Sequence, residues 1–109
     1  MAITGIYANL SCSDIERSRD WYETLFDRAP DANPMTGLFE WRWGNHGFQL
    51  HENAGAAGKG TLTLMAGGLI AERARLAGFE PGEIEKATQT CIMKLRDPDG
   101  NLVVMAGDA

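Results

Sequence analysis

The sequence contains no apolar run long enough to cross a bilayer, and its first residues lack the positive segment and apolar core of a secretory signal. Cysteine is scarce as well, because Cys12 and Cys91 are the only two and have no metal-finger spacing. We therefore expect a cytoplasmic protein with no membrane partner, in which both cysteines are buried free thiols.

Positive charge is also in short supply. The 109 residues include 10 Lys and Arg against 15 Asp and Glu, a formal net charge of −5 at pH 7, and the basic residues are dispersed. Nucleic-acid binding requires positive charge clustered on one surface, so we expect no nucleic-acid partner. The acidic excess is ordinary for solubility and slightly favours a cationic ligand. The length suits a single domain, residues 1–109, with a modest core.

The hydrophobic pattern predicts the same order of elements twice, on either side of a Gly- and Ala-rich linker at residues 54–60. In the first half, Ser13 and Glu16 have the spacing of a capping box, and a buried helical stripe begins at Ile15. In the second half, Gly78 ends a short helix. We predict units at about 1–55 and 58–109, with strands at 3–11, 27–34, 37–43, 47–52, 61–65, 82–87, 89–96 and 101–106, and helices after Ser13 and at 69–76.

The stretch Asp97-Pro98-Asp99-Gly100-Asn101 predicts a tight turn between the last two strands. Pro98 fixes φ, the Asp side chains accept hydrogen bonds from backbone amides, and Gly100 adopts a positive φ. Taken with the helix start Ser13-Asp14-Ile15-Glu16-Arg17-Ser18 and the pair Trp21-Tyr22, this turn resembles the vicinal oxygen chelate superfamily, which includes glyoxalase I, the bleomycin-resistance proteins and the extradiol dioxygenases. The resemblance implies an α+β fold in which two βαβββ units form a curved eight-stranded mixed sheet cup.

The same resemblance identifies the positions where a metal would be held. In the metal-dependent members, His, Glu or Gln side chains from the first and fourth strands of each unit bind a divalent ion in the cup. The matching positions here are Tyr7, Gln49, Thr61 and Val104. Valine has no donor atom, Tyr and Thr are poor neutral ligands, and a Gln amide oxygen is a weak one. We therefore expect no metal and no cofactor.

The loop at 44–47 joins two predicted strands whose side chains alternate between a polar and an apolar face. A turn centred on Asn45-His46 pairs Glu40 with His51. A histidine beside a carboxylate can act as a general base, which would give His51 that role. The alternative is an exposed sheet face with a solvated ion pair. The polar set predicted to line the cup is Glu40, Arg42, Gln49 and His51 with Tyr7 and Thr61, and the apolar set predicted to lie beneath the helices is Trp41, Trp43, Phe48 and Leu50.

The absent metal donors and the acidic balance favour a metal-independent small-molecule-binding protein, akin to the bleomycin-resistance proteins, that holds a polar or cationic ligand in the sheet cup. The alternative is a metal-dependent lyase, isomerase or dioxygenase with an unconventional site, and a third interpretation is a dimer without a ligand. The short chain, the proline-bearing edge strand and an uncovered sheet face predict a homodimer.

Overall fold

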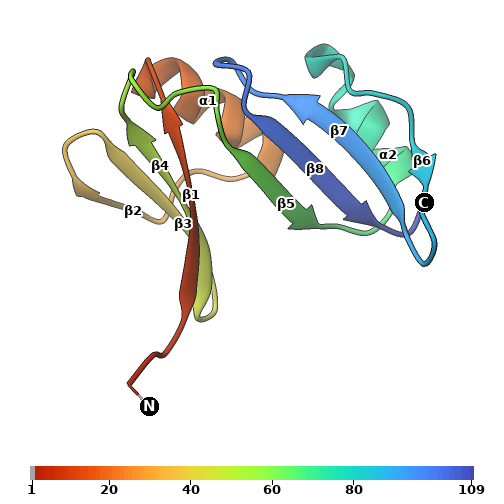
Figure 1. The fold of residues 1–109 in the computed structure, drawn as a ribbon, viewed down its shortest axis with the longest axis horizontal. Coiled ribbons are helices and arrows are strands. Elements are labelled where there is room, and N and C mark those ends of the chain that lie inside the picture. Colours follow the sequence, from red (N-terminus) through yellow and green to blue (C-terminus); the bar gives the residue numbers. More distant parts are fainter. Residues whose placement is uncertain (1) are drawn as a thin grey trace.

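A computed structural model describes residues 2–109 as two four-stranded sheets, each with a helix on one face (Figure 1). The strand order is β1-β4-β3-β2 in the first sheet and β5-β8-β7-β6 in the second, which confirms the repeat of two βαβββ units. The two sheets together form a cup, so the fold is α+β as predicted. The elements are β1 (Ile6–Cys12), α1 (Ile15–Phe26), β2 (Ala32–Met35), β3 (Leu38–Trp43), β4 (His46–Glu52), β5 (Thr61–Met65), α2 (Leu69–Arg75), the 3₁₀ turn η1 (Ala77–Phe79), β6 (Glu85–Lys86), β7 (Cys91–Arg96) and β8 (Leu102–Gly107).

Helix α1 begins one residue later than the capping box predicts. Its N-cap is Asp14, whose carboxylate accepts a hydrogen bond from the Arg17 N–H over 3.2 Å. Ser13 instead binds Asp99 in the other half. The Ser13 backbone N–H and the Ser13 hydroxyl both donate to the Asp99 carboxylate. The helix ends at Asp27, which has a left-handed φ of 54°. Neither helix in residues 2–109 is long and apolar enough to cross a membrane.

The β3–β4 hairpin has a tighter turn than predicted. Its turn consists of Gly44 and Asn45 alone, and Gly44 supplies the positive φ of 62° that a two-residue turn requires at its first position. The register therefore differs by two residues from the predicted one, and Glu40 pairs with Gln49 rather than with His51. A shift of two residues leaves every side chain on the same face, so the predicted faces hold although the predicted pairs are wrong.

The β7–β8 turn has the predicted geometry. The Gly100 N–H donates to the Asp97 carbonyl over 2.9 Å, and Gly100 has a φ of 93°. The Asp97 carboxylate oxygen Oδ1 accepts from the backbone N–H groups of Asp99 and Asn101. The preceding edge strand is shorter than predicted, because only Glu85–Lys86 pairs regularly with β7.

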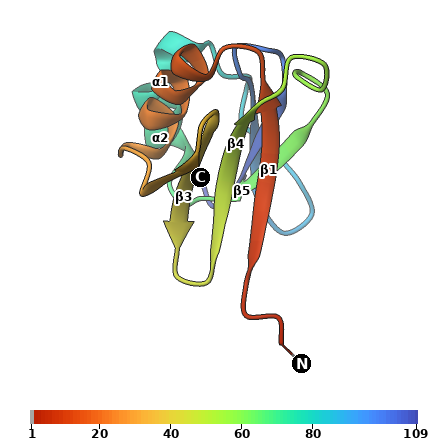
Figure 2. The same cartoon turned by 90° about the vertical axis from the view of Figure 1, so that its left-hand side faces the viewer.

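Aromatic side chains pack α1 onto the first sheet. The Tyr22 ring centroid lies 4.9 Å from that of Phe48, and the Phe26 centroid lies 5.3 Å from that of Trp41. Figure 2 shows both helices on one side of the strands. Across residues 2–109 the buried apolar side chains are Leu10, Cys12, Tyr22, Leu25, Trp41, Phe48, Leu50, Leu62, Leu69, Leu76, Met93, Leu95, Val103 and Met105.

Two predicted burials are wrong. Trp43 is 36% exposed, because it lies at the end of β3, where Phe26 packs edge-to-face against its ring and the Arg28 guanidinium lies over it. Cys91 is only half-buried, at the start of β7. Cys12 is fully buried as expected, and burial raises the pKa of its thiol to about 11, so the thiol stays protonated. Both cysteines are free.

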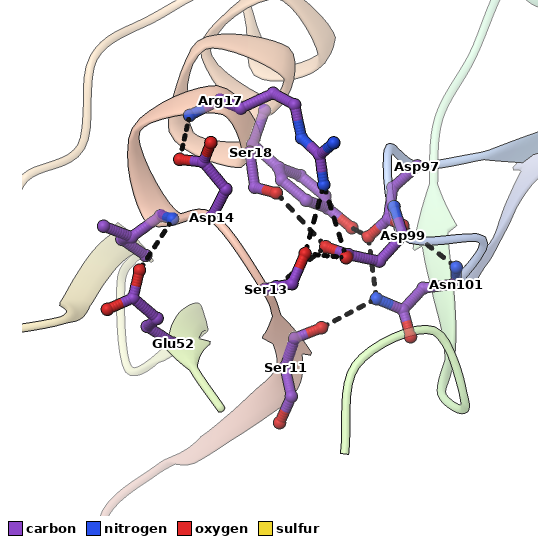
Figure 3. Close-up of polar contacts among 11 residues, drawn as sticks. Ser11, Ser13, Asp14, Arg17, Ser18, Glu52, Asp97, Asp99 and Asn101 are labelled. Carbon is purple, nitrogen blue, oxygen red and sulfur yellow. Dashed lines mark hydrogen bonds and ion pairs between the residues drawn. The ribbon is translucent and has the colours of Figure 1, made fainter. Parts of the chain in front are cut away.

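A buried carboxylate joins the two halves (Figure 3). Tyr22 Oη on α1 donates to Asp97 Oδ2 over 2.7 Å, and Asn101 Nδ2 donates to the same oxygen over 2.8 Å. Asn101 Nδ2 also donates to the carbonyl of Ser11 at the end of β1 over 2.9 Å. Burial, followed by the nearby Asp97 charge, raises the pKa of Tyr22, which keeps the hydroxyl protonated as a donor. We call Tyr22, Asp97, Asn101 and Ser11 the Asp97 network.

Removal of one donor tests how strongly the Asp97 network holds the halves. We expect Tyr22→Phe to lower the free energy of unfolding by about 1–3 kcal/mol, because the buried Asp97 carboxylate loses a hydrogen bond while the ring remains. Urea unfolding measures this change. The control is Tyr7→Phe on the partly exposed Tyr7, which should alter stability by less than about 0.5 kcal/mol. Equal effects of the two substitutions would contradict the prediction.

Candidate functional site

The helix-free face of the first sheet carries most of the predicted site residues. Strand alternation sends Trp41, Phe48 and Leu50 toward α1, where all three are buried, so their sequence neighbours point the opposite way. The register then places Asn9 of β1 beside Gln49 of β4, and Gln49 beside Glu40 of β3. Side chains from three adjacent strands therefore meet on this face.

Hydrogen bonds connect these side chains into a row. Gln49 Nε2 donates to Glu40 Oε1 over 2.8 Å, and Arg42 Nε donates to Glu40 Oε2 over 2.7 Å. Asn9 Nδ2 extends the row by a longer contact of 3.4 Å to Gln49 Oε1. The hydrogen bond from Gln49, and then that from Arg42, lowers the pKa of Glu40, whose side chain is buried although this face has no helix. We call Asn9, Gln49, Glu40 and Arg42 the polar row.

Tyr7 lies next to the polar row because residue 47 is a glycine. A Cβ atom at Gly47 would come within 2.8 Å of Tyr7 Cε2 and within 2.4 Å of the Trp41 carbonyl oxygen. The Tyr7 ring therefore occupies space that any other residue at position 47 would need. Gly47 pairs with Tyr7 on one side and with Arg42 on the other, so Tyr7 lies at the Arg42 end of the row. Glu40, and to a smaller degree Tyr7, raises the pKa of Arg42.

The remaining predicted residues do not join the row. His51 pairs with Leu38 rather than with Glu40, so the expected Glu40–His51 pair is not formed. Within residues 2–109 no hydrogen bond or ion pair connects those two side chains. Thr61 is the first residue of β5 in the other sheet and is exposed. The structure thus brings together Tyr7, Glu40, Arg42 and Gln49, and it adds Asn9, which was not among the predicted site residues.

The residues at the expected metal positions do not fit a divalent ion. Tyr7, Gln49, Thr61 and Val104 all lie on the helix-free faces, as the resemblance implies, but they offer no imidazole, carboxylate or thiolate. In the described part of the chain no three His, Cys, Asp or Glu side chains come close enough to hold a metal. No chemical step is therefore assigned to a metal here.

A groove lies between the two halves, beside β1 and β5. This groove has a volume of about 680 Å³. Of the predicted site residues only Tyr7 lines it. No local pattern in the sequence indicates the groove, because its walls come from the two different halves of the chain, which strand alternation alone cannot place side by side. Its lining includes Ile6, Tyr7, Trp43, Phe48, Leu64 and Met65.

Comparison with solved structures places this arrangement in a known fold class, although no family model and no curated protein sequence matches the chain. A glyoxalase/bleomycin resistance protein from Catenulispora acidiphila superposes with a TM-score of 0.84 at 21% identity, covering 96% of this chain and 98% of that one. TnmS3, an antibiotic-binding protein from Streptomyces sp. CB03234, gives 0.84 at 19% identity, covering 100% and 99%.

A bleomycin-binding protein, solved as a complex with bleomycin, gives a TM-score of 0.76 at 16% identity, covering 94% of this chain and 97% of that one. The chain therefore has the glyoxalase/bleomycin-resistance fold. The resemblance to the vicinal oxygen chelate superfamily that the sequence motifs carried is confirmed at the level of the fold.

The lowered pKa of Glu40 predicts a contribution to stability that acid removes. The ionised carboxylate stabilises the fold above the unfolded-chain pKa of about 4.3, and this stabilisation disappears as the pH falls through the lower folded-state value. Between about pH 5 and 3, we expect the free energy of unfolding of Glu40→Gln to fall less steeply than that of the wild type. Urea unfolding at each pH measures this difference. Glu85→Gln, on the exposed strand β6, is the control and should follow the wild type. Parallel curves for Glu40→Gln and the wild type would contradict this assignment.

Proposed function

We propose that the protein binds a polar or cationic small molecule in the sheet cup without the participation of a metal. The observation that carries the proposal is the polar row. Its carboxylate is fixed by two donors before any ligand arrives, while the Arg42 side chain is 49% exposed and keeps donor groups free. A rigid set of polar groups on a concave sheet face binds a ligand with little loss of side-chain entropy.

Each predicted residue has a role in this proposal. Arg42 and Tyr7 present donors at one end of the row, and Gln49 lies at its centre between Asn9 and Glu40. We expect the ligand to span the cup from this face toward the opposite sheet. His51 and Thr61 are then the remaining polar contacts, and Glu40 acts by positioning Arg42 and Gln49.

The comparisons support binding of a small molecule. Two of the similar structures are described as a bleomycin-binding protein and an antibiotic-binding protein. Another, at 16% identity and a TM-score of 0.77, is a lactoylglutathione lyase from Agrobacterium tumefaciens. The donor set at Tyr7, Gln49, Thr61 and Val104 disfavours the alternative of a metal-dependent enzyme, because it offers no ligand that a transition metal prefers.

The test is the thermal stability of the protein with metal-free bleomycin and a panel of other cationic antibiotics, before and after exhaustive dialysis against a chelator. A ligand at a hundred times its dissociation constant stabilises the fold by about 2.7 kcal/mol, which raises the melting temperature. We expect the stabilisation to survive chelation and Arg42→Ala to weaken binding about 10- to 100-fold.

Arg73→Ala is the matched control for Arg42→Ala. Arg73 is a similarly exposed arginine, paired with Glu83 on the far side of the second half, and its loss should leave ligand binding unchanged. Elemental analysis should find no stoichiometric transition metal in protein purified without chelators. About one Fe, Mn, Ni or Zn per chain, removed by chelation together with the thermal shift, would contradict the proposal.

We also propose a cytoplasmic, twofold homodimer. Its support is the short edge strand β2, which contains Pro34, the free cysteines, and the large apolar side chains exposed on residues 2–109, among them Ile3 at 75% and Met65 at 86%. Light scattering at micromolar concentration should give about twice the chain mass of 11.9 kDa. A mass near that of one chain would exclude a dimer at this concentration.

A further inference from the structure

The helix-free faces of the two sheets have an excess of positive charge. In β7, Met93 and Leu95 are buried beneath α2, so Lys94 and Arg96 lie on the helix-free face. In β6, Glu85 pairs with Ile92 and lies on that face too. The chain as a whole has a net charge of −5, so these faces have the opposite balance. Their charged strand residues are the cations Arg42, Lys94 and Arg96 and the carboxylates Glu40 and Glu85.

The carboxylate of the polar row is withdrawn from the surface, and its cation is not. The Glu40 side chain is only 8% exposed, whereas that of Arg42, its ion-pair partner, is 49% exposed. A carboxylate removed from water keeps its charge only when hydrogen bonds replace its hydration, which Gln49 and Arg42 provide here. A ligand on this face is therefore in contact with the Arg42 guanidinium rather than with the Glu40 carboxylate.

Glu40 occupies one edge of the Arg42 guanidinium and fixes its plane. Arg42 Nε at 2.7 Å and Arg42 Nη2 at 2.6 Å both contact the same oxygen, Glu40 Oε2. Gln49 Nε2 holds the other oxygen, Glu40 Oε1, over 2.8 Å. Because the guanidinium is bound along one edge to a buried side chain that is itself held, little of its rotational freedom remains to be lost when a ligand binds.

The other edge of the guanidinium, between Nη1 and Nη2, is open to a second acceptor. Among residues 2–109 no carboxylate contacts Arg42 Nη1. The N–H groups along this edge lie side by side and match the two oxygens of one carboxylate, an arrangement that makes arginine the preferred residue for such groups. The Tyr7 hydroxyl at the same end of the polar row adds a further donor.

From the open edge of Arg42, the buried carboxylate that fixes it and the cationic balance of the helix-free faces, we propose that the ligand of the polar row carries a carboxylate, which binds Nη1 and Nη2 of Arg42. This inference rests on the proposed function and narrows its ligand to the polar class. A cationic group would meet the charge of Arg42, and both oxygens of the Glu40 carboxylate are already bound.

The experiment compares two probes of the same shape, benzoate, which is an anion at pH 7, and benzamide, which is neutral. NMR titration of the whole ¹⁵N-labelled chain follows the Nε–H resonance of Arg42. We expect benzoate to shift this resonance with a dissociation constant at least about tenfold lower than that of benzamide, because only the carboxylate accepts charge-assisted hydrogen bonds at both oxygens. Equal affinity for the two probes would overturn the proposal.

Two substitutions separate the fork of Arg42 from its charge. Arg42→Gln removes both and should weaken benzoate at least about tenfold, whereas Arg42→Lys keeps the charge alone and should weaken it about three- to tenfold. The backbone N–H of Gly47, which lies between Tyr7 and Arg42, reports binding in these variants. Wild-type affinity in Arg42→Lys would overturn the two-point contact. The comparison of the two probes on the wild type does not depend on how the variants fold.

Arg73→Gln is the matched control. The Arg73 side chain is 40% exposed and also pairs with a glutamate, but that partner, Glu83, is 86% exposed and does not fix the guanidinium. We expect Arg73→Gln to bind benzoate as the wild type does, and the Arg73 Nε–H resonance of the wild type to stay unshifted. Equal shifts at Arg73 and Arg42 would show attraction to any exposed arginine and overturn the proposal.

The outcomes distinguish this inference from the proposed function. A cationic antibiotic that binds through Arg42, in a protein that does not bind benzoate there, would overturn the carboxylate site and leave the proposed function standing. Benzoate that binds Arg42, in a protein that carries about one transition metal per chain, would contradict metal-independent binding and leave the carboxylate site standing.

Discussion

The burial of the Asp97 carboxylate is the constraint on which the arrangement of the two halves depends. A charge removed from water costs free energy unless hydrogen bonds replace its hydration, and here four donors do so, one of them the Tyr22 hydroxyl from the other half. Helix α1 is thereby fixed to the β7–β8 turn. The same turn binds the start of α1 through Asp99 and Ser13. Together with the hydrogen bonds from Arg75 to the carbonyls of Thr24 and Leu25, these contacts hold the two halves against each other.

Much of the fold was predictable because it is encoded in local patterns. Strand alternation assigned the faces of β3 and β4 correctly, and it did so despite an error of two residues in the register, since a period of two is unaffected by such a shift. The β7–β8 turn was predictable for a similar reason, because Pro98 and Gly100 restrict the backbone whatever surrounds them. The repeat of two units followed from the order of the elements.

What the sequence could not provide was decided by contacts between distant residues. Serine is a residue type favoured at N-caps, but Ser13 binds Asp99, 86 positions away, and Asp14 is the N-cap instead. Trp43 belonged to the apolar face by alternation, but α1 ends too early to cover it. Of the candidate site, Glu40, Arg42 and Gln49 were found because they alternate along two paired strands. The groove was missed because its walls meet only in three dimensions.

The close approach of Tyr7 to Gly47 has a consequence for how this surface changes during evolution. Any side chain at position 47 would collide with the ring at position 7 and with the Trp41 carbonyl oxygen of β3. A small residue at position 7 removes the first collision but not the second, so position 47 has to stay glycine whatever residue stands at position 7. A ring at position 7, in turn, needs the free space over a glycine. In related chains the glycine at 47 should therefore be retained more strictly than the aromatic residue at 7, and an aromatic residue at 7 should occur only opposite a glycine.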